Sequence, residues 1–136
     1  MSEATVQARL MVALAPLVAE GSVLLNDHNT PQTVSRERGP WLVVETGDAL
    51  RLETPNFSNV QATYEPYVAV VVYPLADGKE HTQVTRFQTL RQAAAEALLA
   101  ADGVDLVETV GSLARYFGDD AGLFQRLRVR VTEFEV

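Results

Sequence analysis

The sequence contains no cysteine, and this absence removes disulfides, thiolate metal ligands and cysteine nucleophiles from the available chemistry. A chain without cysteine is expected inside the cell or where redox state has no bearing on the fold. No run of about 18 apolar residues occurs either, so we predict no membrane-spanning segment. The first residues, MSEATVQARL, include an early acid and no basic stretch, which is not the pattern of a secretory signal.

Positive charge is scarce in this chain. Eleven Lys and Arg residues stand against eighteen Asp and Glu residues, and the formal net charge is −7. Because neutralising phosphates requires a cationic surface, this balance argues against a dedicated nucleic-acid-binding protein.

Motifs for nucleotide binding and catalysis are also missing. Neither glycine-rich phosphate loop, GxGxxG or GxxxxGK[ST], occurs, and GxSxG is absent. A metal site formed by His28, His81 and Asp77 is a weaker interpretation than solvated surface residues. Asp119 and Asp120 fit a turn better than an acid–base pair. We therefore predict that the chain is not an enzyme and has no catalytic residue, cofactor or metal.

What the chain does have is enough apolar sequence for one core. Its 136 residues are 47% hydrophobic, and a chain of this length is expected to form one domain, here residues 1–136. About two thirds of the unfolded surface can be buried at this size.

Two helices are predicted from apolar residues that recur with helical spacing. The first covers residues 2–20, and Pro16 is expected to kink or restart it. The second begins near residue 82 and ends at Asp102–Gly103. The residues expected to face inward are Val6, Leu10, Leu14 and Leu17 or Val18 in the first helix and Val84, Phe87, Leu90 or Arg91, Ala94 and Leu98 in the second.

Strands are predicted between and after these helices. WLVVE and ALRLE (residues 41–45 and 49–53) are expected to form a hairpin. YEPYVAVVVY is expected to be a central strand covered on both faces, with Pro66 near its start or at a bulge. The other predicted elements are a possible short strand from GSVLLND, polar loops at residues 27–40 and 53–65, a short strand near Leu106–Val110 and a final hairpin around residues 118–122. The predicted class is α+β, with an antiparallel or mixed β-sheet and two main helices packed on one face.

The last segment, LFQRLRVRVTEFEV, alternates between apolar and basic residues. As a strand it places Arg126, Arg128 and Arg130 on one face, followed by Phe134. Three interpretations remain open: a solvated sheet face with cross-strand ion pairs, a phosphate contact, or a subunit interface that pairs with acids of a neighbouring copy. The two faces exchange character near Thr132–Glu133, which predicts a bulge or bend there.

The order of these segments resembles a known family. An N-terminal helix (VQARLMVALAPLV), polar loops around PWLVVE, the stretch YEPYVAVVVYPLADGKEHTQVTRFQTLRQAAAEALLAADG and the final RLRVRVTEFEV are similar to the tail terminator and tail-completion proteins of long-tailed bacteriophages, the lambda-type family. The likeness covers nearly the whole chain. It is one of pattern, because the family has no catalytic motif to match residue by residue.

The resemblance implies a structural virion protein. Such proteins form a ring, usually of six copies, at the head-proximal end of the tail tube, after assembly in the host cytoplasm. The ring stops tube polymerisation and presents a surface to the head–tail connector or neck protein, while DNA passes through the lumen without specific binding. The implied partners are other copies of the chain, the tail tube protein and the neck protein, with no membrane.

On this interpretation Arg126, Arg128, Arg130 and Phe134 are the candidate subunit interface. Acids of a neighbouring copy, from residues 102–108 or 45–53, would be their counterpart. The alternative function is a small-molecule-binding or regulatory α+β domain with a pocket beside the sheet.

Overall fold

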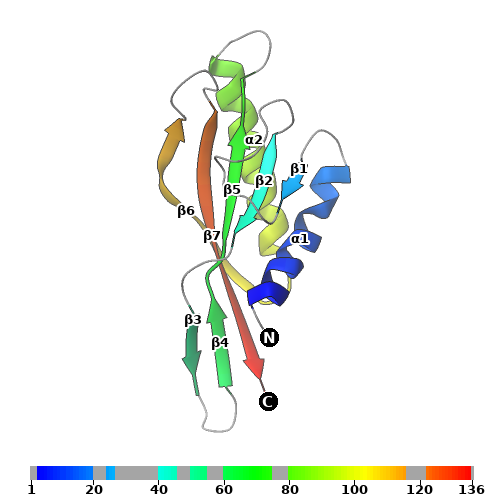
Figure 1. Cartoon of the computed structure of the whole chain (residues 1–136), viewed down its shortest axis with the longest axis vertical. Helices are drawn as coiled ribbons and strands as arrows, with labels where there is room; N and C mark the ends of the chain where they lie inside the picture. Colours follow the sequence, from blue (N-terminus) through cyan, green and yellow to red (C-terminus); the bar gives the residue numbers. More distant parts are fainter. Residues whose placement is uncertain are drawn as a thin grey trace.

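The described part of the chain forms one β-sheet and two helices, both packed on the same face of the sheet (Figure 1). The structure, a computed structural model, describes residues 3–19, 24–26, 40–45, 50–54, 60–74, 80–115 and 122–135. The elements are α1 (Glu3–Ala19), β1 (Leu24–Asn26), β2 (Trp41–Glu45), β3 (Leu50–Glu53), β4 (Val60–Tyr64), β5 (Tyr67–Val72), α2 (Glu80–Leu99), β6 (Val104–Arg115) and β7 (Leu123–Glu135). The predicted α+β class with both helices on one face is confirmed. No helix in the described part of the chain is long and apolar enough to cross a membrane.

The sheet is organised around β7. Among the described strands the order is β1-β2-β5-β7-β4-β3, and β6 pairs with β7 as well. The β1–β2 pair is parallel and the other pairs are antiparallel, so the sheet is mixed. The predicted final hairpin is confirmed as the β6–β7 pair.

β4 and β5 pair with β7 as though they were one strand. Tyr67 pairs with Arg128, and three residues further along both strands Tyr64 pairs with Val131, so the register has no break. Pro66 lies between the two strands, and its carbonyl accepts a hydrogen bond from the Val129 N–H at 2.9 Å. A proline fits this junction because its missing N–H is the only backbone bond that the ladder loses.

The hairpin predicted for residues 41–53 is wrong. β2 pairs with β5, with Trp41 opposite Val71, while β3 pairs with β4, with Leu50 opposite Tyr64. The predicted polar loop at 53–65 is also wrong in part, because residues 60–64 form β4. In β4 Ala62 and Tyr64 are buried and alternate with polar residues, a period-two pattern that suits pairing with β3. The rest of that segment from 55 to 59, like most of the predicted loop at 27–40, lies outside the described residues.

β6 is longer than the predicted short strand, and it carries the irregularities of the sheet. Its pairing with β7 shifts register between Val104 and Leu106 and again between Val110 and Ala114. Gly111, inside the second shift, has a φ of +70°, a conformation that glycine adopts without steric cost.

The bulge predicted near Thr132–Glu133 is wrong, because β7 pairs regularly with β4 from Val131 to Glu135. Glu133 remains on the same face as Val131 and forms an ion pair with Arg9 of α1. The acid at position 133 is therefore explained by its charged partner Arg9 on α1, because the side chain stays on the same face of the strand.

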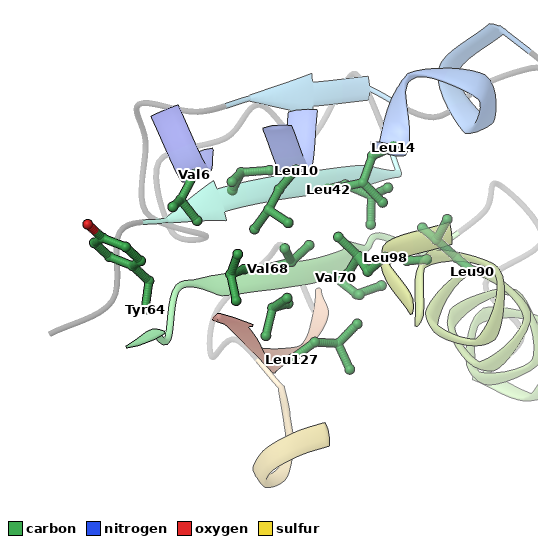
Figure 2. Packing of buried hydrophobic residues seen from close by; sticks show 14 of the residues in the cluster. Val6, Leu10, Leu14, Leu42, Tyr64, Val68, Val70, Leu90, Leu98 and Leu127 are labelled. Atoms are coloured by element: carbon green, nitrogen blue, oxygen red, sulfur yellow. The ribbon is translucent and has the colours of Figure 1, made fainter. Parts of the chain in front are cut away.

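The main core lies between the helices and the sheet (Figure 2). Its buried residues include Val6, Leu10 and Leu14 of α1, Phe87, Leu90, Ala94 and Leu98 of α2, Val68, Val70 and Val72 of β5, and Leu123, Leu127, Val129 and Val131 of β7. The predicted inward faces of both helices are confirmed, with Val84 and Leu17 partly buried against the same core. α1 runs without interruption through Pro16, because Pro16 and Val12, whose carbonyl loses its bond, are both exposed.

A smaller cluster covers the other face of β5. Val43, Ala69, Val71 and Tyr73 are buried there, with Trp41 and Phe124 packed against them. This confirms that the valine-rich strand is central and covered on both faces.

Three glutamines complete the hydrogen bonding of the strands. The Nε2 of Gln7 donates to the Val44 carbonyl at 2.8 Å, and that of Gln83 donates to the Val72 carbonyl at 3.0 Å. Gln125 is buried on β7; its Nε2 donates to the Gly111 carbonyl at 2.9 Å, and its Oε1 accepts from Arg91 at 2.7 Å. Each of these glutamines therefore satisfies a backbone carbonyl, and Gln125 also bonds to the side chain of Arg91.

Replacing Phe87 with alanine tests the packing of α2 on the sheet. Phe87 is fully buried, so Phe87→Ala is expected to lower the free energy of unfolding by about 3–5 kcal/mol. Gln88→Ala, at the next and exposed position, is the control and should change it by less than about 0.5 kcal/mol. Urea unfolding followed by circular dichroism measures both, and equal midpoints for the two variants would contradict the helix register.

Candidate subunit interface

The alternation predicted for the last strand is confirmed along β7. Leu123, Gln125, Leu127, Val129 and Val131 are buried on the face that meets the helices. Arg126, Arg128 and Arg130, called the arginine face below, are half-buried on the opposite face. Phe134 belongs to β7 and pairs with Gln61, but its side chain lies outside the described part of the structure.

Each arginine of the arginine face meets an acid on another strand of the same chain. Arg126 donates two hydrogen bonds to Glu45, from Nε to Oε2 at 2.7 Å and from Nη2 to Oε1 at 3.3 Å. Arg128 Nη1 lies 3.1 Å from Glu108 Oε1. Arg130 Nε lies 2.7 Å from Asp105 Oδ1. Strand pairing positions Glu108 directly opposite Arg128. Glu45 is not on a neighbouring strand, because it lies on β2, two strands away from β7.

Local hydrogen bonds reinforce the charge on two of these side chains. The interaction with Tyr67, followed by that with Glu108, raises the pKa of Arg128 above its ordinary value. The hydrogen bond to Asp105 raises the pKa of Arg130 in the same way. Both guanidinium groups therefore remain charged throughout the pH range in which proteins are normally folded.

Ion pairs within the chain account for the arginine face without a neighbouring subunit. The segments expected to supply acids from another copy, 102–108 and 45–53, supply Asp105, Glu108 and Glu45 from the same chain. This is the arrangement expected of a partly solvated sheet face with cross-strand pairs. The assignment of Arg126, Arg128, Arg130 and Phe134 to a subunit interface stays a prediction.

A different surface, not predicted from the sequence, is formed by β3, β4 and residues 131–135 of β7, which we call the arm. Figure 1 shows the arm extending past the end of the helix layer. Leu50, Leu52 and Val60 on the arm are 52%, 62% and 38% exposed. The alternation in LRLE and VQATY was the available signal, but it shows only that a strand has an apolar face and not that this face is uncovered.

A second exposed apolar surface lies on α1. Its outer face consists of Thr5, Ala8, Val12, Ala15 and Pro16, all exposed, and Val12 is 74% exposed. The outer face of α2 is mostly polar by contrast, with Gln88, Gln92 and Glu96 exposed and Leu99 at its end 51% exposed. Exposed apolar residues that gather on one face, unlike scattered ones, are typical of protein–protein contacts.

Residues considered for other chemistry are not brought together. No group of three or more His, Asp or Glu side chains suited to a metal occurs among the residues that the structure describes. His81 is exposed in the first turn of α2. The other members of the metal and acid–base alternatives, His28, Asp77, Asp119 and Asp120, lie outside the described residues.

Comparison with known proteins adds no relative: no protein-family model matches the chain, and no curated protein sequence matches it. The resemblance to phage tail proteins therefore depends on the pattern of the sequence.

Charge reversal at Arg128 tests whether the arginine face is an interface. Arg128→Glu places a like charge opposite Glu108, so we expect a lower melting temperature that a second change, Glu108→Arg, restores. Because both partners belong to one chain, the molar mass from light scattering should equal that of the unchanged protein. A folded Arg128→Glu variant that has lost self-association would instead make the arginine face a subunit contact.

Proposed function

We propose that this chain is a structural protein of a phage tail, forming a ring at the head-proximal end of the tail tube. The ring would stop tube polymerisation and present the surface to which the head or neck attaches. The observation that carries the proposal is the arm with its exposed Leu50, Leu52 and Val60. A monomeric domain rarely leaves such residues on an extension of its sheet, whereas a subunit of an assembly needs them.

The resemblance to tail terminator proteins narrows this assembly to a ring, with six copies as the expected number. A ring of identical subunits needs a heterologous contact, in which two different surfaces of the same chain meet. The chain offers two separate apolar surfaces for that purpose, the arm and the outer face of α1. Contacts through Leu50, Leu52, Val60 and Val12 would leave the main core in place, because these four side chains are exposed.

The net charge suits a ring through which DNA passes. At −7 per copy, a ring of several copies would repel the phosphate backbone, so DNA would move through the lumen without binding. The arginine face does not reverse this sign, because its three cations are each paired with an acid.

A terminator acts by ending a repeating contact. Each tube ring that is added regenerates the surface for the next one, so the tube grows as long as subunits are present. A ring that binds the last tube ring and offers no such surface on its other side stops polymerisation, so the length of the tube is fixed. The partners of this chain would then be the tail tube protein on one side and the head–tail connector or neck protein on the other.

Deleting the gene for this chain in its phage tests the proposal. We expect intact heads and tails that are overlong or not joined to heads, because the growing tube end remains competent. Electron microscopy of the lysate measures tail length and the fraction of joined particles, and supplying the gene from a plasmid is the control. Joined tails of normal length without the gene would refute the proposal and favour the ligand-binding alternative.

A further inference from the structure

The face of the sheet that holds the main core continues onto the arm. Leu52 pairs with Ala62 and Leu50 pairs with Tyr64. Paired residues of antiparallel strands point to the same side, and Ala62 and Tyr64 are buried in the core beneath the helices. Figure 2 shows Tyr64 at one end of this core, next to Val6. Leu50 and Leu52 therefore extend the core face to a region where the structure shows no helix above them (Figure 1).

A helix with an apolar outer surface would complete the layer above Leu50 and Leu52, and α1 has such a surface. α1 already buries Val6, Leu10 and Leu14 against its own sheet. Its opposite side, the outer face, is also apolar apart from Thr5, with Val12 74% exposed among small residues. A helix that is apolar on both sides is typical of one that is buried on both sides. Within the described part of the chain its own sheet covers only this one side, so another copy can cover the second.

Charge favours contact between these two surfaces of separate copies. Copies that each carry −7 repel one another over most of their surfaces. The outer face of α1 has no charged residue. On β3, which carries both leucines, Arg51 pairs with Glu53, so the charges of that strand are balanced. The two surfaces can approach each other without the repulsion that other orientations meet.

The spacing of the side chains also agrees. Leu50 and Leu52 are two residues apart on a strand, so their Cα atoms are separated by about 6.7 Å. Along α1, Val12 lies about 6 Å from Ala8 and about 4.5 Å from Ala15. The separation of the two leucines is close to that of Ala8 and Val12, so the leucines can contact successive turns of the helix.

We infer that the arm of one copy packs through Leu50, Leu52 and Val60 on the outer face of α1 of the next copy. The contact is head-to-tail, because α1 presents its other side to its own sheet. Repetition closes a ring when the rotation between copies divides the circle, and otherwise gives a filament. The inference rests on the proposed function for the ring, and it adds the identity of the two surfaces that join.

Cross-linking tests the contact directly, because the chain has no cysteine of its own. In Leu52→Cys/Val12→Cys, where both exposed positions carry a thiol, mild oxidation should give covalent dimers, trimers and larger products on a non-reducing gel. Neither single variant should cross-link beyond a trace. Leu52→Cys/Gln92→Cys, with its second thiol on the polar outer face of α2, is the matched control and should give no ladder. Efficient cross-linking of Leu52→Cys with itself would overturn the inference, because it requires arms that meet each other.

Charge variants give an independent measurement. Leu52→Glu and Val12→Glu each remove one of the two surfaces, and we expect folded protein by circular dichroism but monomers by light scattering. A mixture of the two should form dimers and nothing larger, because each pair joins the intact arm of one copy to the intact α1 of the other. Normal assembly of either variant would overturn the inference. Gene-deletion tails that are overlong would still uphold the terminator function in that event, so the two failures can be told apart.

Discussion

Pairing between β7 and the stretch that runs from β4 through β5 is the constraint on which the rest of the molecule depends. One uninterrupted register joins residues 60–72 to residues 123–135. The first half of this ladder lies under the helices and forms the core, while the second half continues past them as the arm. A single pair of long strands therefore links the stable centre of the fold to its most exposed surface. A shift of one residue would turn the core face outward along both halves at once.

The helices are fixed to this ladder by polar contacts as well as by packing. Arg9 of α1 donates to the Asp102 carbonyl at 3.1 Å and pairs with Glu133 of β7 at the base of the arm. Arg91 of α2 donates a hydrogen bond to Gln125 of β7, and Gln125 donates one to the Gly111 carbonyl of β6. These contacts set the position of α1 relative to the arm, so the two apolar surfaces of one copy keep a constant relation. An assembly with a defined number of copies needs such a constant angle.

Local periodicity predicted much of this fold, but it could not predict the pairing of residues that lie far apart in the chain. The spacing of Phe87, Ala94 and Leu98 gave the inward face of α2, and alternation gave the side of β7 on which Arg126 lies. Neither pattern identifies a partner: Glu45, which binds Arg126, is 81 residues away. For the same reason the sequence predicts that β2 pairs with β3, because strands that are adjacent in the chain often pair and the actual partners, β5 and β4, lie further along the chain. The candidate contact on the arm could not be predicted, because the lack of a helix above Leu52 is a property of the packed molecule.

The position of β7 in the chain has a consequence for biosynthesis. β7 follows every strand with which it pairs, yet it lies at the centre of the sheet. While the ribosome makes the earlier strands, neither β5 nor β6 has its main partner, so the nascent chain cannot close its core or form the arm. Contacts of such long sequence separation also slow folding compared with local ones. The proposed contact surface on the arm is therefore completed only after this strand has emerged.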